Sequence, residues 1–418
     1  MPKGFDAGDT SFVLISAALV MLMTPGLAFF YGGMVRVKSV LNMLLMSFIS
    51  LGIVTVLWVA FGYSLAFGDD VGAGLVGGLG LAGMHGVSGE SLTGTIPVFA
   101  FAVFQLMFAV ITPALISGAI ADRAKFGAWM LFIVLWVSLV YFPVAHWVWQ
   151  SDGWIYKLGV KDFAGGTAVH INAGMAALGA LLVLGKRVGF KKEPMRPHSL
   201  PLVMLGSGLL WFGWFGFNAG SALAANGTAS IAFLNTQVAT GAAMIGWLAW
   251  ERLRHGSFTS LGAACGAVAG LVAITPACAA VGVWGAIAIG VIAGVVCAWA
   301  VGLKDRLGYD DSLDVVGVHA VGGVVGTLLI GVFDISDGLI AGAGPAQLGK
   351  QAVGALAVAA YSLAASWLLA KVIDITVGFR VSRVHEIAGI DLFVHAENAY
   401  ELATVRELHL TPAPDTAR

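Results

Sequence analysis

Residues 162–174 read Asp-Phe-Ala-Gly-Gly-Thr-Ala-Val-His-Ile-Asn-Ala-Gly, an apolar, glycine-rich stretch that contains one histidine, His170. Residues 314–323 read Asp-Val-Val-Gly-Val-His-Ala-Val-Gly-Gly and have the same character around His319. A histidine at membrane depth is costly unless it faces a partner, a cavity or a pathway, so it indicates a functional site by default. The two stretches therefore predict a membrane protein whose function involves two buried imidazoles.

The composition outside these stretches is also that of a membrane protein. Of the 418 residues, 59% are hydrophobic and 11% are charged, whereas soluble domains carry about 25% charged residues. The formal net charge of −1 gives no electrostatic argument for a nucleic-acid partner. The polar start of the chain lacks the basic region and cleavage site of a signal peptide, so we expect the first apolar run to be retained.

The long apolar runs indicate the fold class. A helix needs about 20 predominantly apolar residues to cross a bilayer. The sequence holds eleven such runs, which predict an all-α polytopic membrane protein with eleven transmembrane helices. They lie near residues 11–33, 40–67, 96–120, 126–148, 164–185, 199–221, 229–250, 259–277, 281–303, 315–333 and 349–377.

Lysine and arginine are distributed unevenly between the loops that join these runs. Basic residues favour cytoplasmic loops. The loops after spans 1, 3, 5, 7 and 9 are rich in them, whereas the intervening loops hold only Lys157, Lys161 and Lys350. We therefore expect the odd-numbered loops and the C-terminal tail to be cytoplasmic and the N-terminus to be outside. The basic residues of the odd-numbered loops are Arg36, Lys38, Arg123, Lys125, Lys186, Arg187, Lys191, Lys192, Arg196, Arg252, Arg254, Lys304 and Arg306.

Two features recur five spans apart. The tetrapeptide Ile-Thr-Pro-Ala occurs at residues 111–114 in span 3 and at 274–277 in span 8, and His170 and His319 lie in spans 5 and 10. A unit of five helices ends on the side opposite to its start, so a second copy must be inverted. Inverted repeats place a substrate pathway at the interface between the repeats, near the midplane of the membrane.

This repetition predicts the domain organisation. The inverted repeats extend over about residues 11–185 and 199–333, and an extra helix follows at about 349–377. Together they form a transmembrane domain of residues 1–380, followed by a cytoplasmic tail of residues 381–418.

Each histidine projects from a helix face made of small residues. Gly166 and Gly174 lie four residues before and after His170, and Gly323 lies four residues after His319, so each set shares one face. This arrangement favours two rings that meet between the repeats. A packing role as a buried, hydrogen-bonded histidine is the alternative for each ring. Bis-histidine haem ligation is a further alternative, although the sequence offers no other metal-ligand set near either ring.

Acidic residues precede both histidines. Asp162 opens span 5 eight residues before His170, and Asp314 holds what looks like the parallel place before His319. A carboxylate at the start of a helix caps free backbone N–H groups. It also stabilises a cation that arrives at the mouth of a pathway. The sequence leaves both roles open.

The outer half of the predicted bundle is rich in aromatic residues. Phe108, Trp149 and Phe217 lie there, and Ser221 ends span 6 in a polar break. Aromatic residues at the membrane interface commonly form an anchoring belt. Aromatic faces beside a hydroxyl acceptor can also hold a small cation, which is worth about 0.5–2 kcal/mol. The composition alone leaves both interpretations open.

Longer motifs carry a family resemblance. Besides the two histidine stretches, the chain contains Trp-Phe-Gly-Phe-Asn-Ala-Gly-Ser at 214–221 and Phe-Phe-Tyr-Gly-Gly at 29–33. The tail contains Ile-Ala-Gly-Ile-Asp at 387–391 and His-Ala-Glu-Asn-Ala-Tyr at 395–400. With these motifs the chain resembles the Amt/Mep/Rh ammonium transporter family, in its bacterial Amt branch, over essentially its whole length.

The resemblance implies an ammonium transporter rather than an enzyme, with a pore in each subunit of a homotrimer, without cofactor or metal. It implies a multi-pass protein of the cell (inner) membrane. It also implies that a PII-type signalling protein docks on the cytoplasmic face. The residues that it assigns are Trp149, Phe108, Ser221 and Asp162 for ammonium recruitment, Phe108 and Phe217 for a gate, and His170 and His319 for the pore lining and proton relay.

A transport mechanism follows from the cost of desolvation. A bare cation is expensive to move into an apolar lumen. We therefore expect ammonium to be bound outside and deprotonated, so that neutral ammonia passes along the lumen.

The tail departs from the family pattern. Residues 380–386 read Arg-Val-Ser-Arg-Val-His-Glu where relatives often carry an acidic run, and Ala396 and Asn398 stand where Gly and Ser are commoner. These departures distinguish the tail from the family pattern on which the implied regulation rests. They leave open a second function, that of an ammonium-sensing receptor with a transporter fold.

Overall fold

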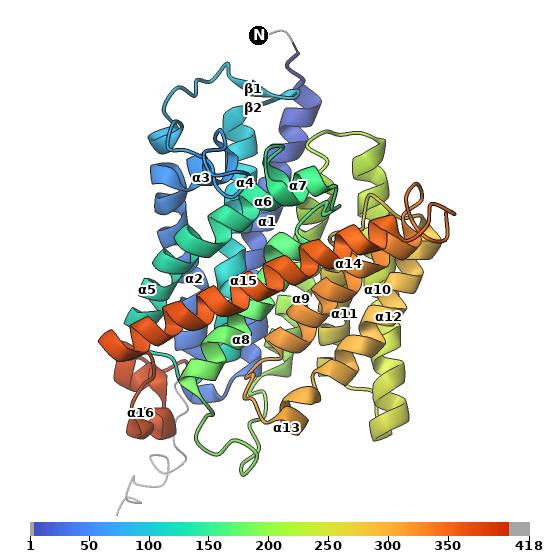
Figure 1. Ribbon diagram of the computed structural model, residues 1–418. Helices are drawn as coiled ribbons and strands as arrows, with labels where there is room; N and C mark the ends of the chain where they lie inside the picture. Colours follow the sequence, from blue (N-terminus) through green and yellow to red (C-terminus); the bar gives the residue numbers. More distant parts are fainter. Residues whose placement is uncertain (1–3, 401–418) are drawn as a thin grey trace, which may run out of the picture.

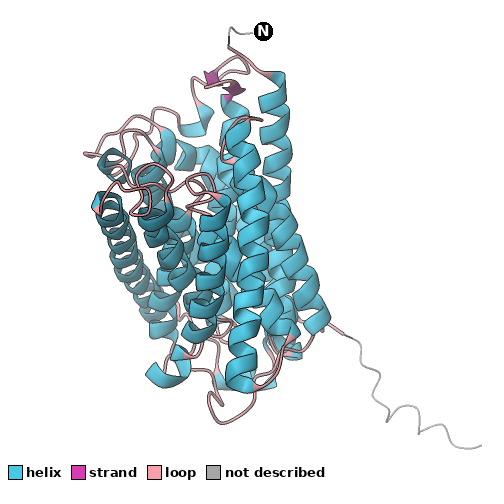
Figure 2. Cartoon of the chain, turned by 90° about the vertical axis from the view of Figure 1, so that its right-hand side faces the viewer, coloured by secondary structure: helices cyan, strands magenta, loops and turns pink. Residues whose placement is uncertain are grey.

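The computed structural model describes residues 4–400, so the tail beyond residue 400 and the first three residues lie outside the described part. Within it, the chain forms a bundle of long helices whose loops gather at the two ends (Figures 1 and 2). One short antiparallel hairpin, β1 (Leu92–Thr93) with β2 (Ile96–Pro97), lies at the end where the described chain begins. The prediction of an all-α multi-pass membrane protein is confirmed.

Ten helical segments in residues 4–400 are long and apolar enough to cross a membrane, and each coincides with a predicted span. The remaining predicted span, near 259–277, forms an apolar helix of 15 residues, Ser260–Ile274. That helix is shorter than the roughly 20 residues that a crossing needs, because it gives way to a series of turns. The count of eleven transmembrane helices therefore stays a prediction.

The first half of the chain contains these elements in order: α1 (Ala7–Met34), η1 (Val37–Ser39), α2 (Val40–Leu57), η2 (Trp58–Gly62), α3 (Tyr63–Phe67), η3 (Ala82–Met84), the hairpin, α4 (Val98–Ser117), η4 (Gly118–Ile120), α5 (Phe126–Trp136), η5 (Val137–Tyr141), α6 (Phe142–Trp149), α7 (Trp154–Leu158), η6 (Gly166–Ile171) and α8 (Asn172–Leu184). The second half contains α9 (Leu200–Gly220), α10 (Gly227–His255), α11 (Ser260–Ile274), α12 (Val283–Ala300), α13 (Leu303–Leu307), η7 (Val316–Ala320), α14 (Val321–Phe333), α15 (Ala346–Thr376), α16 (Arg383–Ala388) and η8 (Asp391–His395).

Short polar side chains fix where several helices begin. Asp6 accepts a hydrogen bond from the backbone N–H of Asp9 at the start of α1. Asn226 and Thr259 cap α10 and α11 in the same way, through the N–H groups of Ala229 and Gly262. A side-chain oxygen at this position satisfies one of the free N–H groups of the first helical turn.

Small residues bring helix backbones together in the bundle. The first helices of the two halves, α1 and α9, pack along each other, and a Cβ on Gly206 would lie 2.2 Å from the backbone nitrogen of Phe30. α10 packs on α12 in the same manner, since a Cβ on Gly294 would lie 2.2 Å from the carbonyl oxygen of Ala243. Such close approach is typical of helix packing in membranes.

The last long helix, α15, runs obliquely across the outside of the other helices (Figure 1). The described chain begins at one end of the bundle, and α16 lies at the other end (Figure 1). This placement agrees with an odd number of crossings. The assignment of these ends to the outside and the cytoplasm stays a prediction.

Candidate functional site

His170 and His319 meet in the interior of the bundle. The Nδ1 atoms of the two rings lie 3.3 Å apart, and the ring planes are within 19° of parallel. Only 1% of His170 and 3% of His319 is exposed. Trp214 stacks on His170 with 5.3 Å between ring centroids. The structure thus brings together the two rings that the sequence placed in separate halves.

The local backbone is alike around both histidines. Each lies in a π-helical turn, His170 in η6 and His319 in η7, and each turn continues directly into an α-helix. π-helical turns occur mostly as single insertions in helices, and frequently at functional sites.

Glycines four residues after each histidine allow the two turns to approach each other. A Cβ on Gly174 would lie 2.3 Å from the backbone nitrogen of Ala320, the residue after His319. A Cβ on Gly323 would lie 3.0 Å from the side chain of Ile171, the residue after His170. The glycine of each half therefore lies against the residue that follows the histidine of the other half. This reciprocal contact is expected for a twofold relation between repeats.

The histidine pair borders a very small apolar cavity. Its volume is about 10 Å³, which is close to the space of a single water molecule. The Nε2 atom of His170 is buried there and has no hydrogen-bond partner among residues 4–400. The cavity is lined by Met23, Leu27, Ile111, Leu115, Val169, His170, Leu210, Trp214, Phe217, Val268 and His319.

Two phenylalanines lie between this cavity, which Phe217 lines, and a second one, which Phe108 lines. The ring centroids of Phe108 and Phe217 are 4.2 Å apart at an angle of 40°. Both side chains are 1% exposed. Trp149 meets Phe108 edge-on, with 5.8 Å between centroids. The predicted gate pair is therefore in contact, and it separates the histidines from the Trp149 side.

A second cavity lies on the Trp149 side of the phenylalanine pair. Its volume is about 130 Å³, enough for several small molecules. Ser221 faces it, and its hydroxyl donates to the carbonyl oxygen of Phe217 at 2.8 Å, so the hydroxyl lone pairs stay available. The structure thus brings Phe108, Trp149 and Ser221 to one cavity. The full lining is Phe67, Phe101, Gln105, Phe108, Trp149, Phe163, Ser221 and Leu223.

Gln105 also lines this cavity, and the sequence analysis did not single it out. Its Oε1 atom is buried and has no hydrogen-bond partner among residues 4–400. An unpaired buried carbonyl is costly, so this acceptor is suited to a ligand that donates hydrogen bonds. The available signal was a glutamine in an otherwise apolar span, three residues before Phe108.

Asp162 acts as a cap for η6. Its carboxylate accepts the backbone N–H groups of Gly165 (2.7 Å), Gly166 (2.6 Å), Thr167 (2.7 Å) and Ala168 (3.2 Å), and the Thr167 hydroxyl. Its backbone carbonyl accepts a hydrogen bond from Trp149 Nε1 at 3.1 Å. Asp162 therefore holds the start of the histidine turn and orients the tryptophan.

The parallel role expected of Asp314 is wrong, because Asp311 has that role. Asp311 accepts the N–H groups of Val315 (3.1 Å) and Val316 (2.7 Å) at the start of η7. Asp314 instead forms an ion pair with Lys304 at 2.5 Å. Asp311 precedes His319 by eight residues, the separation between Asp162 and His170. Equal spacing was the signal that would have identified it.

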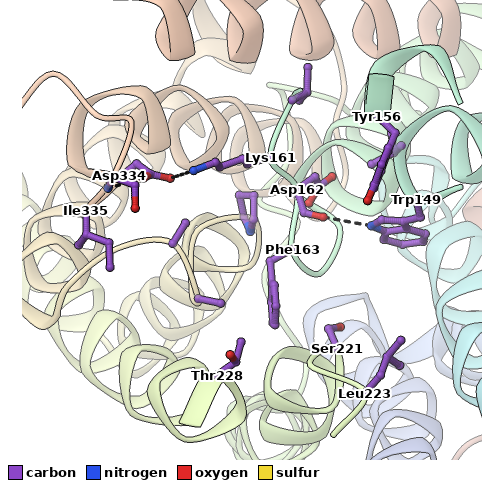
Figure 3. A pocket seen from close by; sticks show the side chains of 16 residues that line it. Trp149, Tyr156, Lys161, Asp162, Phe163, Ser221, Leu223, Thr228, Asp334 and Ile335 are labelled. Carbon is purple, nitrogen blue, oxygen red and sulfur yellow. Dashed lines mark hydrogen bonds and ion pairs between the residues drawn. The ribbon is translucent and has the colours of Figure 1, made fainter. Parts of the chain in front are cut away.

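A wide vestibule opens beside Asp162. Its volume is about 690 Å³, and Figure 3 shows Trp149, Asp162 and Ser221 around it, with Lys161 extended toward Asp334. The lining combines apolar walls with a few charged groups, as in typical small-molecule sites. It consists of Val148, Trp149, Tyr156, Val160, Lys161, Asp162, Phe163, Ser221, Leu223, Thr228, Pro276, Ala279, Ala280, Asp334, Ile335 and Ser336.

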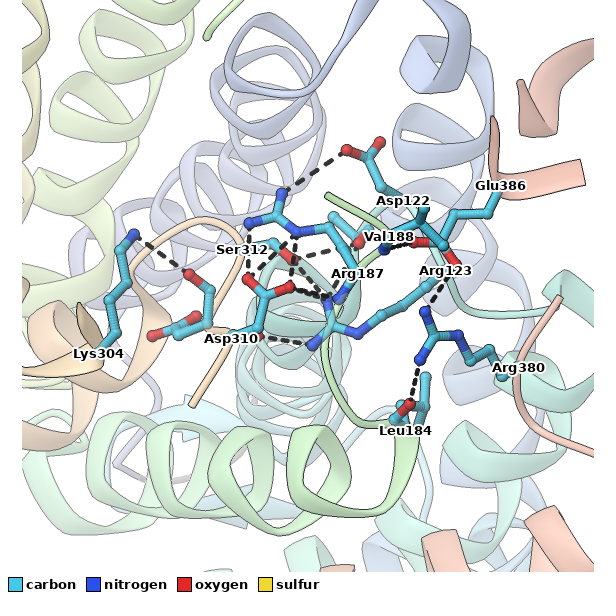
Figure 4. A network of polar contacts seen from close by, with 12 residues as sticks. Asp122, Arg123, Leu184, Arg187, Val188, Lys304, Asp310, Ser312, Arg380 and Glu386 are labelled. Atoms are coloured by element: carbon cyan, nitrogen blue, oxygen red, sulfur yellow. Dashed lines mark hydrogen bonds and ion pairs between the residues drawn. The ribbon is translucent and has the colours of Figure 1, made fainter. Parts of the chain in front are cut away.

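A buried ionic network lies at the other end of the bundle (Figure 4). The guanidinium of Arg187 donates to both oxygens of Asp310, with Nη2 to Oδ1 at 2.7 Å, and Arg123 donates to the Asp310 carbonyl at 2.6 Å. Burial raises the pKa of Asp310, but its bonds with Arg187 outweigh burial and lower the pKa below its ordinary value. Glu386 of α16 joins the network through Arg380 and the N–H of Val188. The network ties the described tail to the bundle.

No three His, Cys, Asp or Glu side chains converge as a metal-ion site within residues 4–400. The candidate site contains two imidazoles, aromatic rings, hydroxyl and amide acceptors and one helix cap. Such groups are suited to hold and pass a small hydrogen-bonding solute.

Comparison with known proteins assigns the family. Residues 11–400 match the model of the Ammonium Transporter Family. An ammonium transporter of Mycobacterium bovis is 56% identical over 443 residues, which cover 97% of this chain and 93% of the relative. An ammonium transporter of Bacillus subtilis is 47% identical and covers 94% of this chain and 98% of the relative.

Solved structures agree with this assignment. The crystal structure of Candida albicans Mep2 superposes with a TM-score of 0.87 at 32% identity, covering 96% of this chain and 94% of that one. A structure titled sensor Amt protein superposes with a TM-score of 0.86 at 30% identity, covering 92% and 98%. The match over nearly the whole chain, together with the helix bundle that holds the paired histidines, shows that the chain belongs to the ammonium transporter family.

Proposed function

We propose that the chain recruits ammonium in the 130 Å³ cavity, removes a proton there and passes ammonia along the histidine-lined lumen. The aromatic faces of Phe108 and Trp149 attract a small cation. The Ser221 hydroxyl accepts one of its hydrogen bonds, and Asp162 keeps Trp149 in place through the hydrogen bond to its backbone carbonyl. Recruitment therefore needs no buried counter-charge at the bound cation.

The size of the lumen supports the deprotonation step. The cavity beside the histidines measures about 10 Å³ and is lined mainly by apolar side chains. Such a space cannot keep the hydration shell of a cation, whose desolvation costs many kcal/mol without compensation. Neutral ammonia has a far smaller desolvation cost, so ammonium transfers its proton to water of the adjoining vestibule and enters the lumen as ammonia. The Phe108–Phe217 pair is the gate that ammonia passes first.

The histidine pair is the observation that carries the proposal. Because their Nδ1 atoms lie 3.3 Å apart, one Nδ1 donates its proton and the other accepts it. Each neutral imidazole carries one N–H, so one Nε2 is left as an acceptor and the other as a donor. The pair therefore presents both hydrogen-bonding roles to ammonia, and the shared proton provides a relay.

Substitution of the histidines tests this function. We expect His170→Asp and His319→Glu to lower the selectivity for ammonium over potassium, because a carboxylate admits a hydrated cation. Currents across proteoliposomes after ammonium or potassium jumps measure that selectivity. His85→Glu, in an exposed outer loop, is the matched control. Unchanged selectivity in both pore variants would reject the proposed role of the histidines.

We further propose the assembly and location that the family resemblance implies. The protein is a homotrimer in the cell membrane, with its N-terminus outside and a pore in each subunit, and a PII-type protein docks on its cytoplasmic face. Native mass spectrometry of the detergent-extracted protein measures the subunit number. A mass of one or two chains would contradict the trimer.

An ammonium-sensing role is the second candidate function, favoured by the likeness to the sensor Amt protein. A transporter moves ammonium in purified form, whereas a sensor binds it without flux. Ammonium-dependent current in liposomes that contain only this protein therefore separates the two. Tight binding without current would favour the sensor.

A further inference from the structure

An ion pair crosses the outer vestibule next to Asp162. The ammonium group of Lys161 lies 2.7 Å from Asp334 Oδ2 and 2.8 Å from Asp337 Oδ2. Lys161 belongs to the loop before η6, whereas both aspartates follow α14 in the other half of the chain. Figure 3 shows the lysine side chain directed along the vestibule wall, away from Asp162. A fixed positive charge thus faces the space that an incoming cation must enter.

The backbone of Lys161 is held rigidly. Its N–H donates to Gln351 Oε1 at 2.7 Å, and its carbonyl accepts from Gln351 Nε2 at 2.8 Å. Gln351 is fully buried in α15 and also bonds to the carbonyl of Thr327 in α14. The lysine is therefore fixed to the helical bundle, and its position is a built feature of the vestibule.

Lys161 and Asp334 are both charged at neutral pH. Burial lowers the pKa of Lys161, but its bonds with Asp334 and Asp337 outweigh burial and raise the pKa. Burial raises the pKa of Asp334, but the bond with Lys161 and the N–H groups of Asp337 and Ser336 outweigh it and lower the pKa. The two carboxylates carry a formal charge of −2. With the lysine, the net formal charge of the three groups is −1.

We propose that Lys161 sets the affinity of the outer vestibule for ammonium by partly neutralising Asp334 and Asp337. This inference rests on the proposed transport function and names a residue that tunes it. Lys161 touches neither the gate nor the histidines. It acts through the charge of the vestibule, where a site with more negative charge concentrates cations.

Two substitutions separate this electrostatic role from a structural one. Lys161→Met removes the bridge between Lys161 and Asp337, and Asp337→Asn weakens it to a hydrogen bond without the carboxylate charge, so loosening of the rim would affect both variants in the same direction. Their effects on charge are opposite. The three groups carry −2 without the lysine charge and 0 without the Asp337 charge.

The expected size follows from Coulomb's law. For unit charges on the order of 10 Å apart, with an effective dielectric constant of roughly 40 to 80, the affinity changes by about two- to fourfold. At an ionic strength of about 1 M the Debye length is about 3 Å, so the effect is largely screened.

The experiment measures the ammonium concentration that gives half-maximal current in proteoliposomes, at low and at high ionic strength. We expect Lys161→Met to lower it two- to fourfold and Asp337→Asn to raise it similarly, with both converging on the wild-type value at high salt. Lys161→Arg keeps the charge. Lys157→Met is a matched control, since Lys157 is exposed and pairs with Asp152 outside the vestibule lining.

Shifts of the two variants in the same direction, no shift, or shifts that salt leaves unchanged would overturn the inference. Absence of ammonium-dependent current in the wild type would contradict the proposed function instead. In that case calorimetric binding of ammonium to the same purified proteins tests the inference, with the same opposite shifts expected in the dissociation constant. Melting temperatures of the variants show whether each is folded.

Discussion

At the scale of single residues, the site depends on groups whose hydrogen-bonding capacity is left unused. The Nε2 atom of His170 and the Oε1 atom of Gln105 are both buried without a partner among residues 4–400. An unpaired buried polar atom costs about 1–3 kcal/mol. The two atoms lie on opposite sides of the Phe108–Phe217 pair. Under the proposed function, each is a point at which a passing solute would gain a hydrogen bond that the protein itself does not supply.

Gln105 provides a test at this scale. Gln105→Leu keeps the volume of the side chain and removes its acceptor. A hydrogen bond to a charged partner contributes about 1.5–3 kcal/mol, so we expect the half-saturating ammonium concentration to rise by about ten- to a hundredfold. Current in proteoliposomes measures it. An unchanged value would mean that Gln105 does not contact the recruited cation.

The acidic caps show what the sequence could and could not predict about residues. The sequence identified Asp162, because its motif places it directly before the glycines that it caps. It led to Asp314 instead of Asp311 in the second half, because the loop there contains three aspartates at 310, 311 and 314. Which of the three reaches the backbone of η7 depends on the turn, since Asp314 adopts a positive φ of 64° and points to Lys304.

Asp311 also leads to a prediction of pH dependence. Burial, and then the nearby charge of Asp314, raise the pKa of Asp311 to about 6, compared with about 3.9 for an unfolded chain. The folded state therefore binds more protons between pH 4 and 6, so this residue makes the protein more stable as the pH falls through that window. Asp311→Asn cannot titrate.

Melting temperatures of wild type and Asp311→Asn between pH 7.5 and 5 check this sign. We expect the wild type to gain stability relative to the variant as the pH decreases. A difference that does not depend on pH would show that the carboxyl group is not protonated in this range. Asp305→Asn, on an exposed side chain in α13, serves as the control.

At the scale of elements, the two π-helical turns and the glycines behind them determine how closely the histidines approach. Gly174 and Gly323 each leave room for the residue that follows the other histidine. Hydrophobic runs in the sequence predicted the helices that carry these turns. The π-helical geometry was beyond the reach of periodicity, because one extra residue in a turn changes the helix locally without altering the apolar run.

Gly174→Ala tests this packing. A Cβ there would lie 2.3 Å from the Ala320 backbone, so we expect a lower melting temperature and reduced ammonium current. Gly241→Ala, in α10, has no atom within 4 Å of the new Cβ. That control should stabilise the helix by about 0.5–1 kcal/mol. Equal effects of the two substitutions would exclude close packing as the reason why position 174 requires a glycine.

At the scale of the whole molecule, the described tail is joined to elements that are far away in sequence. Asp391 accepts the N–H groups of Leu41 (3.0 Å) and Asn42 (2.8 Å) at the start of α2. Glu386 bonds to Val188 in the loop after α8. The sequence alone did not predict where the tail docks on the bundle. Charge patterns do not show which backbone groups a carboxylate reaches. The structure shows that residues 381–395 are anchored at the start of α2 and on the loop after α8.

Asp391→Ala measures the strength of that anchor. Removal of a helix cap costs about 0.5–2 kcal/mol, so we expect a lower melting temperature and faster proteolysis of the tail. Glu397→Ala, on an exposed side chain nearby, is the control. If the tail of Asp391→Ala resists proteolysis as well as that of the wild type, the other contacts suffice to hold it.

The cavity of about 10 Å³ beside the histidines also has a consequence for osmotic balance. A lumen with room for about one molecule of water size, between apolar walls, cannot hold a continuous column of water. Osmotic water flow through the protein is therefore expected to be negligible beside flow through the lipid. If the protein lies in the cell membrane as proposed, many copies of it would not speed the swelling of a cell after a sudden dilution of its surroundings.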